Sequence, residues 1–137
     1  MPIYQRWMAE WEPIDGVLLA LPHEDTDWNY ILPQAIDQYQ RLVKALTDNE
    51  ITAVMLCRDR KVAAQQLAMC NPKYISFVEA DYNDTWTRDY GPFGVLRDER
   101  LRALDFGFNG WGLKFAADKD NLVNLNLKKK GVIAHET

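Results

Sequence analysis

The sequence predicts an α/β fold that forms one domain over residues 1–137. Three observations support this prediction. Short apolar runs alternate along the chain with stretches whose apolar residues recur at helical spacing. The composition, 47% hydrophobic and 26% charged, is typical of a globular domain. In addition, no linker or low-complexity segment divides the chain. Strands that alternate with helices are typical of layered α/β proteins.

Continuous apolar runs predict buried strands over 16–21, 51–57 and 74–78. Two further runs, 93–96 and 101–106, are separated by four charged residues. Their β-branched and aromatic content, together with this short polar connection, predicts a β-hairpin.

Two helices are predicted between the first three strands. The apolar residues of segment 32–47 fall at helical spacing, and Pro33 lies in the first turn, where proline is accepted. Asp59 can cap a second helix that runs to about Met69. The residues of this helix expected to face inward are Val62, Ala63, Leu67 and Ala68.

A last helix is predicted near the C-terminal end of the sequence. Asp118 or Asp120 can cap it, Lys130 ends it, and Gly131 suits the position after its last turn. The apolar residues 132–134 then predict the start of another strand.

Charge and composition exclude several classes of partner. The net charge of −4 argues against a nucleic-acid partner, and the basic run 128–130 falls at the predicted helix end, where cations are favourable. No apolar run approaches membrane-spanning length, so no membrane partner is expected. Residues 1–6 lack the apolar region of a signal peptide, which predicts a cytoplasmic protein. Cys57 and Cys70 fit free thiols and lack metal-ligand spacing, so no metal is expected.

Segment 84–92 combines charge and aromatic surface in an unusual way. It contains two carboxylates, Asp84 and Asp89, together with Trp86 and Tyr90, and it ends in Gly-Pro. Such a mixture suits neither a helix nor a buried strand, so it predicts a loop. Carboxylates and aromatic faces are what a flat organic cation requires, which makes this loop a candidate binding site.

Each carboxylate of this segment has two interpretations. Asp89 either turns the loop through its own backbone or accepts two parallel hydrogen bonds from a guanidinium group. Asp84 can act in the same way, or it can support Arg88, which is expected to pair with a carboxylate.

A second loop, 107–112, is rich in glycine and aromatic residues. Trp111 in this loop and Trp86 in the first are candidate walls around a cation, and the alternative for both is ordinary burial. Asn109 either turns the chain or binds the ligand. The glycine pattern fits neither a dinucleotide site nor a phosphate loop.

Two other reactive side chains are interpreted as structural. His23 follows the first buried strand without a nucleophile nearby in sequence, and Cys57 ends the second strand as a small core residue.

Several of these motifs, taken in order, resemble the agmatine deiminase family, which is grouped with bacterial-type peptidyl-arginine deiminases. Trp-x-Arg-Asp-x-Gly-Pro and Asn-Gly-Trp-Gly are the most specific of them. The motifs lie at 9–13, 22–23, 84–92 and 105–114.

The resemblance implies a pentein-type α/β propeller of five ββαβ blades, of which about two would be present. It implies hydrolysis of a guanidinium group to a ureido group and ammonia without a cofactor. With agmatine the product would be N-carbamoylputrescine, on the route to putrescine. A cysteine thiolate attacks the guanidinium carbon in this family, and a histidine transfers protons.

Residue by residue, Asp89 is similar to the guanidinium-binding carboxylate and Trp86 to a neighbouring wall. The catalytic cysteine and histidine of the family have no counterpart here. We therefore expect this chain to correspond to the first third of a deiminase and to be inactive alone. The residues predicted to bind substrate are Asp84, Trp86, Asp89, Asn109 and Trp111.

Three alternatives remain open at this point: a peptidyl-arginine deiminase, a non-catalytic module that binds guanidinium groups or polyamines, and an interaction domain whose aromatic loops pack on a partner. The sequence leaves the oligomeric state open.

Overall fold

The computed structural model describes residues 4–133 and 135–136. Its centre is a three-stranded parallel sheet of β2 (Gly16–Ala20), β3 (Thr52–Cys57) and β4 (Ile75–Glu79), in that order. These strands confirm the three apolar runs expected to be buried. Their continuous apolar sequences reflect a sheet that is covered on both faces.

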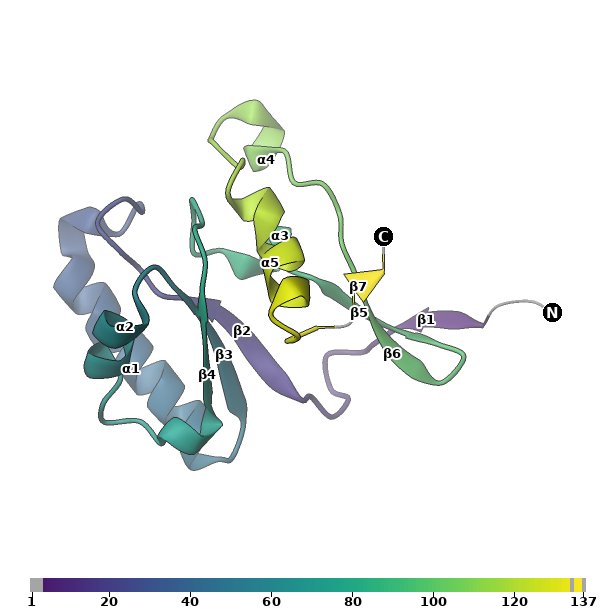
Figure 1. Cartoon of the computed structure of the whole chain (residues 1–137), viewed down its shortest axis with the longest axis horizontal. Helices are drawn as coiled ribbons and strands as arrows, with labels where there is room; N and C mark the ends of the chain where they lie inside the picture. Colours follow the sequence, from purple (N-terminus) through teal and green to yellow (C-terminus); the bar gives the residue numbers. More distant parts are fainter. Residues whose placement is uncertain (1–3, 134, 137) are drawn as a thin grey trace.

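Helices on both faces of this sheet create two hydrophobic cores. Figure 1 shows α1 (Leu32–Asp48) and α2 (Arg60–Gln66) on one side and α5 (Val123–Lys129) on the other. The residues buried on the α1 side include Val43, Met55, Ala63 and Leu67. Those buried on the α5 side include Ala20, Leu56, Val78 and Leu127. Successive strand residues thus alternate between the two cores.

The cap of α2 is as expected, but its length is not. The Asp59 carboxylate accepts hydrogen bonds from the N–H groups of Lys61 and Val62 at 2.8 and 3.0 Å. The helix ends at Gln66, three residues before the predicted end, because Leu67 leaves helical geometry. The inward orientation predicted for Val62 and Ala68 is wrong, since both residues are exposed.

A second, mixed sheet contains β1 (Gln5–Trp7), β5 (Phe93–Arg97), β6 (Arg100–Leu104) and β7 (His135–Glu136), in that order. The predicted hairpin is confirmed as β5 and β6. Asp98 and Glu99 connect these strands with φ of 50° and 63°, as a tight two-residue turn requires.

The two ends of the second sheet were predicted less well. Strand β1, with its short sequence Gln-Arg-Trp, was not predicted. The strand expected to begin at 132–134 begins later, because Val132 and Ile133 form a bend and β7, which pairs parallel with β6, covers only His135–Glu136. Ala134 itself lies outside the described residues.

The remaining elements are short. Single turns form at α3 (Thr87–Tyr90) and α4 (Gly110–Leu113), and 3₁₀ turns form at η1 (Asn29–Ile31), η2 (Pro72–Tyr74) and η3 (Asp120–Leu122). The last helix, α5, begins after η3 and not at an aspartate cap. It ends at Lys129, and Gly131 has φ +70°, as predicted for the residue after the helix.

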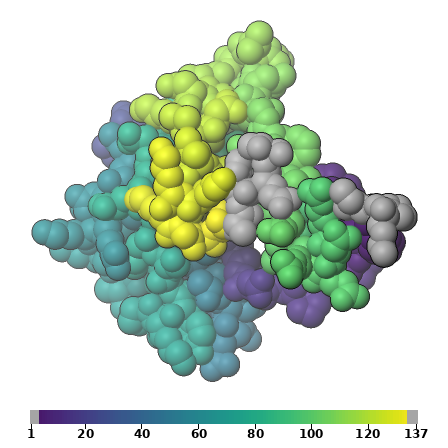
Figure 2. Space-filling model, turned by 45° about the vertical axis from the view of Figure 1, so that its right-hand side comes forward, coloured from purple at the N-terminus to yellow at the C-terminus, as the bar shows by residue number. Residues whose placement is uncertain are grey.

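Helix α5 lies between the two sheets. In Figure 2 it crosses the middle of the visible face in yellow, with the teal part of the chain on one side and the green hairpin on the other. The mixed α/β architecture is as expected. The two sheets do not close into a barrel, and the five-bladed arrangement stays a prediction. None of the helices in the described ranges is long and apolar enough to cross a bilayer.

Candidate functional site

The candidate binding segment 84–92 is not entirely a loop, because Thr87–Tyr90 form the single helical turn α3. The Gly91 N–H closes this turn by donating to the Thr87 carbonyl at 2.7 Å. The Thr87 hydroxyl donates to the Leu18 carbonyl on β2 at 3.0 Å, which attaches α3 to the parallel sheet. The residue types of the segment do not predict this turn, because it is stabilised by the contact with Leu18, which is distant in sequence.

Asp89 projects from α3 into solvent. Its residue is exposed, and within the described part of the chain no hydrogen bond or ion pair engages its carboxylate. The backbone N–H of Asp89 donates to the Trp86 carbonyl at 3.0 Å, so the main chain is fixed while both carboxylate oxygens remain accessible. This arrangement differs from a turn in which an aspartate binds its own backbone.

The Asp84 carboxylate binds the backbone of the two residues that follow it. Its Oδ1 accepts the N–H groups of Thr85 and Trp86 at 2.5 and 3.3 Å. Burial raises the pKa of Asp84 above its ordinary value, and the carboxylates of Asp27 and Asp89 act in the same direction. The two backbone hydrogen bonds oppose this increase. Asp84 therefore organises the start of the segment and adds negative charge beside Asp89.

Trp86 exposes 57% of its surface, so the alternative of ordinary burial does not apply to this residue. The neighbouring Thr85 is buried and accepts a hydrogen bond from the Trp28 indole at 2.8 Å. Trp28 belongs to the loop that follows β2, as does Asp27. Both loops follow the carboxyl ends of parallel strands and meet at the same edge of the sheet. Asp27, whose charge helps to raise the pKa of Asp84, was not predicted to lie near the site. Its place in the loop after the first parallel strand was the signal in the sequence that could have identified it.

Arg88 does not pair with Asp84. Its guanidinium group contacts Glu10 at 3.2 Å, and both side chains are almost fully exposed. The expectation that Arg88 pairs with a carboxylate is confirmed, with a partner far away in sequence.

Buried polar groups beneath the segment contact its two ends. The fully buried Asp120 accepts the N–H groups of Asn83 and Asp84 at 2.7 and 3.2 Å. Burial raises the pKa of Asp120. At the other end, Asn124 donates to the Tyr90 carbonyl at 3.0 Å. The predicted role of Asp120 as a helix cap is wrong, because its carboxylate binds this distant segment.

The second predicted loop has a different organisation. Gly110, Trp111, Gly112 and Leu113 all have φ between 55° and 78°, which gives a left-handed turn. The Asn109 side chain accepts the Gly112 N–H at 2.9 Å, so it caps the turn. Trp111 is 37% exposed and packs edge to face against Phe108 and Phe115 at 5.0 and 5.7 Å.

The structure thus places Asp84, Trp86 and Asp89 on one segment, and Asn109 and Trp111 on another. Tyr90 and Phe108, whose ring centroids are 6.2 Å apart, connect the two segments. Among the described residues, no hydrogen bond or ring contact joins Trp86 to Trp111. The role of Asn109 and Trp111 in binding stays a prediction.

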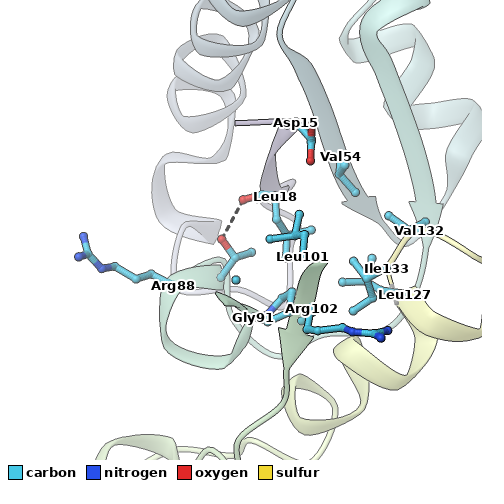
Figure 3. A pocket seen from close by; sticks show the side chains of 15 residues that line it. Asp15, Leu18, Val54, Arg88, Gly91, Leu101, Arg102, Leu127, Val132 and Ile133 are labelled. Atoms are coloured by element: carbon cyan, nitrogen blue, oxygen red, sulfur yellow. Dashed lines mark hydrogen bonds between the residues drawn. The ribbon is translucent and has the colours of Figure 1, made fainter. Parts of the chain in front are cut away.

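A cavity of about 680 Å³ lies on another side of α3, between the two sheets. Figure 3 shows its mainly apolar wall, with Leu18, Val54, Leu101 and Ile133 directed inward. Thr87, Arg88 and Gly91 belong to its lining, whereas Trp86 and Asp89 do not. The candidate cation site is therefore a surface site next to this cavity.

Neither Cys57 nor His23 has the features of a catalytic group. Cys57 is buried, and burial raises the pKa of its thiol to about 11, which suppresses the thiolate. His23 accepts the Asp25 N–H at 3.2 Å and packs on the Tyr82 ring. Burial, together with the nearby Arg58, lowers the pKa of His23. Within the described ranges, no group of histidine, cysteine or acidic side chains is arranged to hold a metal ion.

Comparison with protein families gives a match over most of the chain. The model of the Porphyromonas-type peptidyl-arginine deiminase family matches residues 6–136. A Listeria monocytogenes protein named "Putative agmatine deiminase 2" is 31% identical over 125 residues, which cover 86% of this chain and 33% of the relative. The chain thus spans about a third of the length of the curated relatives that it matches.

Solved structures give the same result. C. jejuni agmatine deiminase with substrate bound superposes with a TM-score of 0.87 at 31% identity, over 98% of this chain and 40% of that one. A Porphyromonas gingivalis structure described as the "Putative Arginine Deiminase" gives a TM-score of 0.82 at 33% identity, over 97% of this chain and 40% of that one. The fold described above is therefore similar to that of these deiminases.

Proposed function

Because this chain belongs to the Porphyromonas-type peptidyl-arginine deiminase family, we propose that its segment 84–92 binds the guanidinium group of a deiminase substrate. The reaction would convert that group to a ureido group and release ammonia. Agmatine is the preferred candidate substrate, since the relatives named above include agmatine deiminases. It would yield N-carbamoylputrescine, on the route to putrescine.

The observation that carries this proposal is that Asp89 and Trp86, three residues apart and joined by a backbone hydrogen bond, are both exposed at the turn α3. A guanidinium group is planar, remains charged at any physiological pH and donates two parallel hydrogen bonds to one carboxylate. The indole face supplies a second attraction to the same cation. Asp84 adds negative charge while its hydrogen bonds fix the backbone.

In this proposal the chain supplies binding residues and no nucleophile. The buried Cys57, with its raised pKa, cannot attack a guanidinium carbon as a thiolate. Cys70 is also buried, and burial raises the pKa of its thiol as well. We therefore expect the 137-residue chain to bind agmatine without releasing ammonia from it.

Isothermal titration calorimetry with agmatine tests the binding. Asp89→Asn should weaken binding about tenfold or more, because the guanidinium loses its oppositely charged partner and one of the two acceptor oxygens. Asp37→Asn is the matched control, since it removes an exposed carboxylate on α1 that pairs with Arg41. Equal affinity in the wild type and in Asp89→Asn would refute the assignment.

Peptidyl arginine is the second candidate substrate, in line with the name of the matching family. An arginine peptide blocked at both ends, titrated beside agmatine, separates the two. Tighter binding of the peptide would favour the second candidate, and ammonia release by either mixture would contradict the expected inactivity.

A further inference from the structure

The contacts beneath segment 84–92 come from residues that the proposed function does not use. They lie on η3 and at the beginning of α5, roughly one helical turn apart. Asp120 and Asn124 are exposed by 0% and 1%, and thus neither can reach a substrate in solvent. Their hydrogen bonds instead reach the beginning and the end of the segment that carries Asp89.

At the beginning of the segment, the contacts are reciprocal. One Asp120 oxygen accepts both the Asn83 and Asp84 N–H groups. In return, the Asn83 side-chain oxygen accepts the N–H groups of Lys119 and Asp120 at 2.9 and 3.2 Å. Four hydrogen bonds therefore join η3 to the residue pair that precedes Thr85.

At the end of the segment, a second set of contacts fixes Tyr90. Asn124 donates through one amide nitrogen to the Tyr90 carbonyl and to the Asp105 carboxylate, at 3.0 and 2.6 Å. The Tyr90 hydroxyl then donates to the Asp84 carbonyl at 2.6 Å. The end of α3 is thus connected back to the beginning of the segment, and Trp86 and Asp89 lie between two fixed points.

We propose that Asp120 and Asn124 are positioning residues, which hold the backbone of segment 83–90 so that Asp89 and Trp86 face the same cation. This inference rests on the proposed function. Its physical basis is that a binding carboxylate is effective only when the surrounding shell fixes its direction. Among the described residues, Asp120 is the one acceptor of the Asn83 and Asp84 N–H groups. Loss of its carboxylate therefore leaves both N–H groups unpaired.

A set of variants separates positioning from general stability. Asp120→Ala removes the acceptor, whereas Asp120→Asn keeps one oxygen in place for both N–H groups. Asp118→Ala is the matched control, because it removes an exposed carboxylate two residues away that contacts only the Asn83 side-chain amide at 3.2 Å among the described residues.

Agmatine affinity and ¹H–¹⁵N NMR spectra of the full chain are the two measurements. We expect Asp120→Ala to weaken binding about tenfold and to move the amide signals of Asn83 and Asp84 and the Trp86 indole signal. Asp120→Asn should bind agmatine within about threefold of the wild-type affinity, because the retained oxygen still accepts both N–H groups and a change of that size corresponds to less than one hydrogen bond in free energy. Asp118→Ala should leave the affinity and the Trp86 indole signal unchanged, with any spectral change confined to the residues near Asn83.

A folded Asp120→Ala protein with wild-type affinity and an unmoved Trp86 signal would overturn the proposal. If Asp120→Ala does not fold, hydrogen exchange of the wild type decides: the Asn83 and Asp84 amides should be protected, and unprotected exchange would refute the role of Asp120. If the wild type does not bind agmatine, the proposed function fails, whereas the NMR signals still decide whether Asp120 positions the segment.

Discussion

Segment 84–92 and the second loop, extended to 107–115 so as to include Phe115, both combine aromatic residues with a tight turn. They are stabilised in different ways. The first has internal hydrogen bonds made by Asp84 and Tyr90, and its attachment to the rest of the chain comes from Asp120, Asn124 and the Leu18 carbonyl. The second has an outside attachment in the two hydrogen bonds of 2.8 and 2.7 Å between Asn121 and the Phe108 backbone, and its turn is otherwise fixed by the Asn109 cap, a left-handed backbone and edge-to-face rings. The comparison teaches that similar composition does not imply a similar role. The first segment leaves Trp86 and Asp89 exposed, while the second uses the side chains of Asn109 and Trp111 for its own stability.

The largest expected effect concerns the left-handed turn. In Gly110→Ala the new Cβ would overlap the Phe115 carbonyl oxygen, at a residue with φ +61°. We expect the free energy of unfolding to fall by about 3 kcal/mol. Gly112→Ala is the matched control, because it has φ +78° but no atom within 4 Å of the new Cβ. Its loss should be about 1 kcal/mol. Urea unfolding measures both, and equal losses would contradict the internal packing of this turn.

The two tryptophans provide the second test of the comparison. Trp111→Ala removes two ring contacts and should lower the free energy of unfolding by about 2 kcal/mol, with little effect on agmatine binding. Trp86→Ala removes an exposed ring, so it should weaken agmatine binding while stability changes by less than about 0.5 kcal/mol. Calorimetric titration and urea unfolding of both variants separate the two effects. If Trp111→Ala weakens binding as much as Trp86→Ala does, both loops belong to one site, as the sequence predicted.

The smallest expected effect is the pH dependence that Asp84 contributes. Its folded pKa lies above the ordinary value of 3.8, so the folded chain binds this proton more tightly than the unfolded chain. Stability from this group is therefore greatest below pH 3.8 and decreases as the pH rises through the folded pKa. Asp84→Asn removes that decrease and keeps the oxygen that accepts the backbone N–H groups. Thermal unfolding of both proteins between pH 3.5 and 6.5 checks this, and parallel curves would show that the Asp84 pKa is not raised.

Features that depend on neighbouring residues were predicted well from the sequence. The three apolar strands, the Asp59 cap and the hairpin of β5 and β6 follow from spacing and residue type. The hairpin turn itself is shorter than the predicted four-residue connection, because Arg97 and Arg100 pair within the strands and leave only Asp98 and Glu99 between them. Strand β1 was not predicted because it has only three residues, two of them polar, and it acquires its partner only from β5.

The candidate site was predicted in part. Asp89 and Trp86 stand out because their residue types are unusual in a turn. Asp120 and Asn124 were not recognised, because their hydrogen bonds reach residues 34 to 37 positions away in the sequence. The helical turn α3 was missed for the same reason, since its attachment to Leu18 spans 69 positions.

The hydrogen bond from Thr87 to Leu18 has a consequence for self-association. Strand β2 lies at the border of its sheet, where unpaired main-chain groups can recruit a strand from another molecule. The Thr87 hydroxyl occupies one of the carbonyl oxygens that an incoming strand would require. The same turn that carries Asp89 therefore also removes one acceptor from the β2 edge, which disfavours the addition of a strand there.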